Sequence, residues 1–184
     1  MKVVLLFSLL LFSGFCSDSK ASGSDGKIFQ PSTGEDRLVD TLIRRLQISR
    51  EVAWTKFANH QPVADPKREE TLLSAMTAQG EKIGLSSIQV TALFQAQIMA
   101  SRKVQEELIE GWNDGKSRPV SPPKNLMTEI RPQVIQISLE LLRNWKEVLS
   151  HPTSAGFQDY AEDRVIRAGF SAQVAALASR PLHQ

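Results

Sequence analysis

Apolar residues recur at intervals of three and four along the chain from Gly34 onward. That spacing places them on one face of an α-helix, and no stretch shows the sustained alternation of a half-buried β-strand. The pattern therefore predicts an all-α fold, a single helical-bundle domain of about six helices. We expect four long helices, at about 36–59, 66–84, 87–112 and 128–149, and two shorter ones that follow His151-Pro152 and meet near Gly169.

The N-terminus has a different pattern. Lys2 is followed by an uncharged apolar run, Val3 to Phe15, and then by small polar residues. The run has the length of the hydrophobic region of a secretory signal and is shorter than a membrane-spanning helix. We expect residues 1–22 to be a signal peptide and polar cleavage region, 23–34 a flexible segment and 35–184 the helical domain. The protein would be exported, either periplasmic or secreted, with no membrane attachment after cleavage.

Composition excludes several classes of protein. The 22 Lys+Arg and 20 Asp+Glu residues leave a net charge of only +2, which does not favour binding to nucleic acid. Cys16 is the only cysteine and falls within the expected signal region, so the exported chain would have neither a disulfide nor a cysteine-bound metal. No cluster with metal-ligand spacing, no Ser-His-Asp arrangement and no glycine-rich phosphate loop is present.

Eight polar residues lie on the apolar sides of the predicted helices or at their margins, when positions are turned by 100° per residue. Most of them also have a simpler explanation. Those on the second helix could form a solvated first turn capped by Asp65. Ser101 and Gln105 on the third could make an interhelical hydrogen bond, and Arg45 and Lys56 could lie on a solvated edge of the first. The residues are Arg45 and Lys56 on the first helix, Asp65, Arg68 and Glu69 on the second, Ser101 and Gln105 on the third, and Arg131 on the fourth.

The cations in this group suggest a site for an anion. Arg131 lies in the first turn of its helix, where the dipole disfavours a cation unless an anion is near. On the first helix Arg44 points away, whereas Arg50 occupies the opposite margin from Arg45 and Lys56, and periodicity does not choose between the two margins. With Arg45 and Lys56 included, four cations and two acids give a pocket of about +2, which suits a small dianion.

These residues, in this order and spacing, resemble the all-α chorismate mutases of the AroQ class, in particular the exported gamma subclass. The resemblance rests on Leu42 to Leu46 with Lys56-Phe57, on Asp65 to Glu69, on Phe94 to Ile98 with Ser101 and Gln105, and on Arg131-Pro132. It implies a chorismate mutase type II-like fold and an isomerase that converts chorismate to prephenate without a cofactor or metal. It also allows a homodimer in which each active site lies within one chain.

The resemblance further implies a role for each residue. Arg45, Arg68 and Arg131 would bind the two carboxylates of the substrate, and Lys56 and Gln105 would donate hydrogen bonds to the breaking ether oxygen. Asp65, Glu69 and Ser101 would hold the ring hydroxyl or orient neighbouring cations. Two alternatives stay open, an isochorismate pyruvate lyase of the same fold and an exported helical binding protein without turnover.

Overall fold

The protein folds as an all-α bundle in the computed structural model, which describes residues 30–182 and contains no strand within that range. This confirms the predicted fold class. Leu126–Ile130 forms a π-helical turn (η1), and Arg180–Leu182 a final 3₁₀ turn (η2). The α-helices are α1 (Thr33–Ala58), α2 (Pro66–Lys82), α3 (Ser87–Asn113), α4 (Arg131–Leu149), α5 (Phe157–Arg167) and α6 (Ala172–Ser179). The predicted signal peptide lies outside the described residues.

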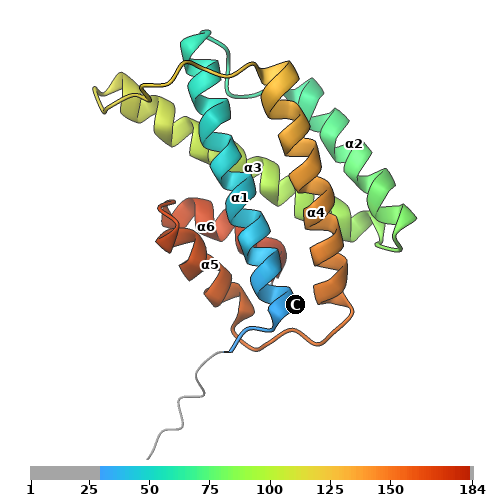
Figure 1. The fold of residues 1–184 in the computed structure, drawn as a ribbon. Helices are drawn as coiled ribbons and strands as arrows, with labels where there is room; N and C mark the ends of the chain where they lie inside the picture. The colour runs from blue at the N-terminus through green and yellow to red at the C-terminus, as the bar shows by residue number, and fades with distance from the viewer. Residues whose placement is uncertain (1–29, 183–184) are drawn as a thin grey trace, which may run out of the picture.

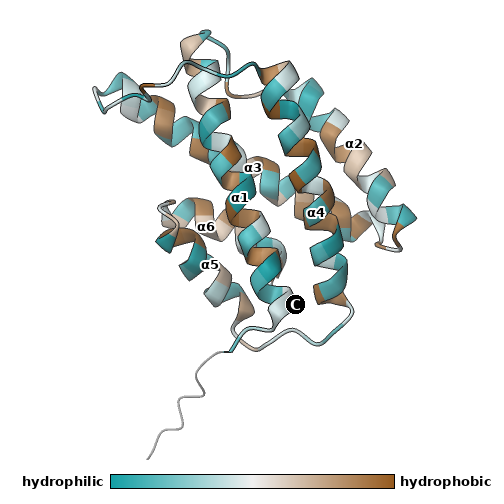
Figure 2. Ribbon diagram, viewed as in Figure 1, coloured by the Kyte–Doolittle hydropathy of each residue, from teal (hydrophilic) through white to brown (hydrophobic). Residues whose placement is uncertain are grey.

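Helix α1 is the central element of the bundle, since it packs along both α4 and α3 (Figure 1). Helix α2 lies against α3 and α4, and the α5–α6 hairpin packs on α1 and α3. Hydrophobic and hydrophilic residues alternate in short segments along the helices (Figure 2). The core between them contains fully buried Leu38, Leu42 and Leu46 from α1, Phe94 from α3 and Leu141 from α4.

Helix α1 begins three residues before the predicted Asp36 because Ser32 and Glu35 form a capping box. The Ser32 hydroxyl accepts a hydrogen bond from the Glu35 amide, and the Glu35 carboxylate accepts one from the Ser32 amide. The same carboxylate accepts bonds from the amide and hydroxyl of Ser154, in the loop before α5. Burial raises the pKa of Glu35, but these hydrogen bonds outweigh it and lower the pKa below its usual value.

Helices α2 and α3 approach closely at Gly80. A Cβ atom at this position would lie 2.4 Å from Cγ2 of the fully buried Val90 on α3. Valine has little rotamer freedom in a helix, so this contact leaves room only for glycine. The close approach holds together the two helices that carry four of the eight predicted site residues, and Asp65, a fifth, is the N-cap of α2.

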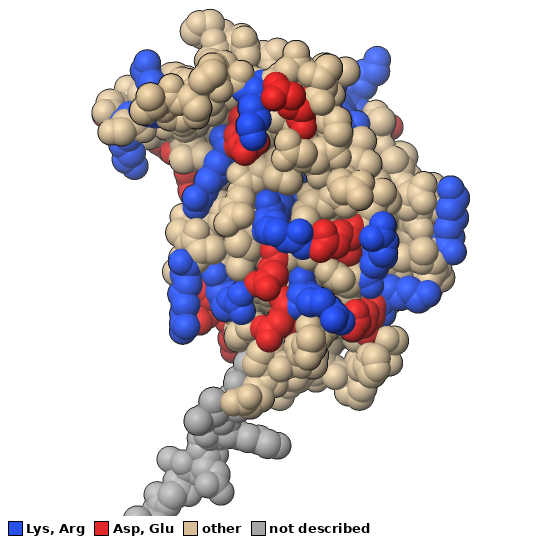
Figure 3. All heavy atoms as spheres, viewed as in Figure 1, with Lys and Arg blue, Asp and Glu red and all other residues tan. Residues whose placement is uncertain are grey.

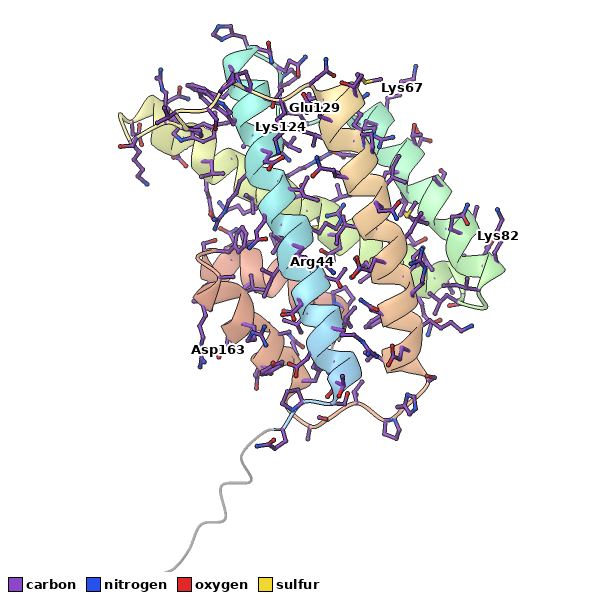
Figure 4. All side chains as sticks on the ribbon, viewed as in Figure 1. Arg44, Lys67, Lys82, Lys124, Glu129 and Asp163 are labelled. Atoms are coloured by element: carbon purple, nitrogen blue, oxygen red, sulfur yellow. The ribbon has the colours of Figure 1, made fainter. Side chains whose placement is uncertain are left out.

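The loop between α3 and α4 is tied to α1 by side chains. The Trp54 indole donates to the Ser121 carbonyl at 2.9 Å, and the Thr55 hydroxyl donates to the Lys124 carbonyl at 3.0 Å. The Lys124 ammonium pairs with Glu51 at 2.9 Å; Figure 4 labels Lys124 near the end of this loop. These contacts fix the point at which α4 begins, and thus the position of Arg131.

Arg50 holds the C-terminal hairpin instead of lining a site. Its guanidinium donates to the carbonyls of Ala168 and Gly169, at 3.3 and 2.9 Å, and lies 4.3 Å from the ring centroid of Phe170. Gly169 has a φ of +84°, which allows the sharp turn between α5 and α6. Periodicity alone did not show whether the Arg50 margin of α1 or the Arg45 and Lys56 margin lines the site. The structure shows that the Arg50 margin packs against the C-terminal hairpin.

Charged groups of both signs alternate over the face shown in Figure 3 and form no continuous patch of one sign there. Several are joined as exposed ion pairs, for example Arg37 with Glu147 and Arg164 with Asp40. Within residues 30–182, no helix combines the length and the apolar character that a membrane span requires.

Candidate active site

All eight predicted site residues line one cavity between α1, α2, α3 and the start of α4. The cavity holds about 660 Å³ of space free of protein atoms, including its open mouth, within the usual range for small-molecule sites. Apolar side chains complete its wall: Val52, Val63, Leu72, Ile98, Leu126, Ile130 and Val134. The structure thus brings together residues that lie up to 86 positions apart, from Arg45 to Arg131.

Arg45 is the most deeply buried cation of this cavity, with 4% of its surface exposed. One guanidinium nitrogen donates to the Gln97 carbonyl at 3.0 Å, while the buried Nε has no hydrogen-bond partner among the described residues. Burial lowers the pKa of Arg45 to about 10, so the side chain is still a cation at neutral pH. No carboxylate of residues 30–182 pairs with it.

Lys56 lies in the same wall, about three turns farther along α1. Its ammonium donates to the Val63 carbonyl at 2.5 Å, which directs it toward the segment before α2. Burial lowers the pKa of Lys56, and the nearby charges of Asp65 and Glu69 oppose that effect. The ammonium has two further N–H groups to offer to a ligand.

Asp65 has both of the functions that the sequence left open. One carboxylate oxygen accepts the Arg68 amide at 3.2 Å and caps α2, with Pro66 at the first helical position. The other lies 3.4 Å from an Arg131 guanidinium nitrogen, so the cap also orients a cation from α4. Burial, and then the neighbouring Arg131, lower the pKa of Arg68, while Asp65 acts to raise it.

Ser101 and Gln105 lie one turn apart on α3. The Ser101 hydroxyl is 2.7 Å from the hydroxyl of Ser49 on α1, so it does connect two helices. The Gln105 amide nitrogen donates to the Ser101 carbonyl at 3.0 Å, and its buried carbonyl oxygen has no partner among the described residues. The amide nitrogen also donates to the Ser101 hydroxyl at the longer distance of 3.4 Å, so its two N–H groups face acceptors of the same residue.

The cavity contains one charged residue that the sequence did not predict. Arg102 follows Ser101 on α3, about 100° around the helix from the apolar stripe, yet its long side chain reaches the cavity wall and pairs with Glu69. The pocket therefore contains five cations and two acids, a formal charge of +3 instead of the predicted value of about +2. Helical periodicity predicts only the direction in which the Cα–Cβ bond points. It does not show that a side chain as long as that of arginine can extend to a cavity on another side of the helix.

Other cations of these helices lie away from the cavity. Arg44 pairs with Glu140 of α4 on the outer side, as predicted for a residue that points away (Figure 4). Arg143 on α4 is exposed and takes no part in the cavity. Within the described part of the chain, no group of three His, Cys, Asp or Glu side chains is arranged to hold a metal ion.

A family model described as chorismate mutase type II matches residues 35–106. Over this range the chain is similar to chorismate mutases of type II. The matched range includes seven of the eight predicted site residues, and only Arg131 lies beyond it. The resemblance that the motifs show is therefore confirmed over residues 35–106.

Two curated proteins illustrate this relationship. The chain is 30% identical over 117 residues to a secreted chorismate mutase of Yersinia pestis, covering 64% of this chain and 62% of that one. It is 29% identical over 140 residues to a monofunctional chorismate mutase of Enterobacter agglomerans, covering 76% and 71%. The chain thus spans less than two thirds of the length of the Yersinia protein and somewhat more of the Enterobacter protein.

A crystal structure of a chorismate mutase from Burkholderia phymatum shares the fold, with a TM-score of 0.72 and 22% identity. The likeness covers 82% of this chain and 98% of that one. The shared fold therefore extends past the matched family range into the helices after α3. The individual roles of the eight residues stay predictions.

Proposed function

We propose that this cavity converts chorismate to prephenate, and that the eight predicted residues carry out the reaction. The observation that carries the proposal is Arg45, a buried cation that lines the cavity and has no carboxylate partner in the described chain. Burying an unpaired charge is costly, and a dianionic ligand would offset that cost. The family match supports the identity of that ligand.

Binding would rest on cations from three helices. Arg45 from α1, Arg68 from α2 and Arg131 from α4 would bind the two substrate carboxylates, for which arginine offers a planar pair of donors. Held this way, the two ends of the substrate would be kept in the compact conformer from which it rearranges. Such confinement would increase the rate of the rearrangement, and no group would have to be transferred to the protein.

Lys56 and Gln105 would act on the reacting atoms. In the rearrangement, one carbon–oxygen bond breaks while one carbon–carbon bond forms within the same molecule, so no proton or electron has to be supplied. Negative charge grows on the ether oxygen as its bond breaks. The two further N–H groups of Lys56 would stabilise it, and so would the Gln105 N–H that makes only the 3.4 Å contact with the Ser101 hydroxyl. Asp65, Glu69 and Ser101 would hold the ring hydroxyl or orient the cations beside them.

The reaction can be followed directly as the loss of chorismate absorbance with purified protein in the presence of a chelator. We expect turnover, and we expect Lys56→Ala to lower kcat by roughly 10², the usual loss for one donor to a developing oxyanion. Arg44→Ala is the matched control on the same helix and should change kcat less than twofold, because Arg44 pairs with Glu140 outside the cavity.

Each alternative outcome of this assay has a distinct meaning. Equal effects of the Lys56 and Arg44 variants would contradict the assignment of Lys56. Pyruvate release from isochorismate without turnover of chorismate would identify a lyase. Saturable binding of chorismate with no loss of absorbance would identify a binding protein.

Gln105 gives a test that depends on pH. Its neutral amide donates at any ordinary pH, whereas a glutamate there would donate only when protonated, and a free glutamate is mostly ionised at pH 7. Gln105→Glu should lose most activity at pH 7.5 and recover much of it toward pH 5, while the parent stays comparatively flat. Profiles of kcat/KM over this range decide the matter, and parallel profiles would leave Gln105 as a structural amide.

Export is the remaining part of the proposal. The apolar run Val3 to Phe15 and the small polar residues after it support a cleaved signal peptide, and the Yersinia relative is named a secreted protein. With the full chain expressed in a secreting host, N-terminal sequencing of the exported protein should find a start between Ser17 and Gly23. Recovery of the uncleaved chain inside the cell would contradict the proposal.

A further inference from the structure

Arg102 makes an arrangement with Glu69 that the proposed roles leave unexplained. Its Nε donates to one carboxylate oxygen of Glu69 at 2.7 Å, and a terminal nitrogen donates to the other. This is the two-bond pairing between a guanidinium and a carboxylate, which fixes orientation as well as distance. The Glu69 hydrogen bond is the main cause that raises the pKa of Arg102.

The pair belongs to the cavity wall, since both side chains line it. The Glu69 side chain is only 21% exposed and that of Arg102 36%. Glu69 lies on α2 and Arg102 on α3, so the pair also bridges the two helices that contribute Arg68 and Ser101. One Glu69 oxygen also accepts the Asp65 amide at the long distance of 3.5 Å, so the two shorter bonds from Arg102 are the main restraint on the direction of its remaining lone pairs.

An unscreened carboxylate at this place would work against the proposed reaction. The substrate has two carboxylates of its own, and like charges in a partly desolvated cavity repel. Arg102 offsets the charge of Glu69 while leaving the carboxylate able to accept a hydrogen bond. The pair therefore faces the place where the substrate would bind, and it is neither fully exposed nor removed from the cavity.

We propose that Arg102 is a positioning residue for this reaction, which holds the Glu69 carboxylate in the orientation that accepts the substrate hydroxyl. The inference rests on the proposed function. The hydroxyl takes no part in bond making or breaking, so its hydrogen bond is the same in the ground state and in the transition state. Loss of such uniform binding raises KM and leaves kcat nearly unchanged.

The experiment compares Arg102→Met, Arg102→Lys and Lys103→Met in chorismate turnover. Arg102→Met should raise KM about tenfold with kcat changed less than threefold, in line with one charge-assisted hydrogen bond. Arg102→Lys keeps the charge but not the two-bond geometry, so its KM should lie between that of the parent and that of Arg102→Met. Lys103 is the matched control, because it pairs with Glu107 at 3.6 Å on the same helix and does not line the cavity.

A second pair of variants separates positioning from direct contact. If Arg102 acts through Glu69, then Arg102→Met in a Glu69→Gln background should raise KM by less than twofold beyond Glu69→Gln alone. A full tenfold rise in that background would show that Arg102 binds substrate itself and would overturn the inference.

Failure of the inference and failure of the function give different results. An active parent in which Arg102→Met behaves like Lys103→Met overturns the role of Arg102 and leaves the chorismate mutase reaction intact. A parent that does not convert chorismate overturns both. Thermal unfolding of each variant identifies any change in KM that comes only from a loss of folded protein.

Discussion

Burial of the Arg45 guanidinium is the constraint on which the rest of this structure depends. The carbonyl of Gln97 on α3 accepts one of its N–H groups, and the Gln97 side chain in turn donates to the Ala178 carbonyl of α6 at 2.9 Å. Helices α1, α3 and the C-terminal hairpin thus combine to hold one charge in place. Since a buried cation without a carboxylate partner destabilises a fold, its retention favours a function over a structural role for Arg45.

Around this charge, each of the two acids of the cavity pairs with an arginine from another helix. Asp65 both caps α2 and orients Arg131 of α4, and Glu69 of α2 pairs with Arg102 of α3. Arg131 and Arg102 are therefore set in position by the fold before an anion binds. For the proposed rearrangement, in which no group is transferred to the protein, such preorganisation would be the main source of rate.

The sequence predicted most of this fold and site, because helical periodicity is a local property. The six helices and the eight inward polar residues followed from spacing and from the family resemblance. What it could not predict depends on tertiary contacts. Only the contacts of Arg50 with the hairpin show that Arg50, unlike Arg45, does not line the cavity. The hydrogen bonds from Trp54 and Thr55 to the proline-rich loop determine where Arg131 lies. Arg102 reaches the cavity only because its side chain is long.

The central claim is that the buried Arg45 binds a dianionic ligand and lowers the stability of the fold. The Arg45→Met variant tests this claim most directly. Urea unfolding and chorismate turnover are measured on the same preparations of parent and variant. The account predicts that the free energy of unfolding stays equal or rises by about 1–3 kcal/mol, since a buried charge is removed. It predicts at the same time that kcat/KM falls by roughly 10² or more, as the loss of a buried charge-paired group implies. A variant that loses several kcal/mol of stability and keeps most of its turnover would contradict the account.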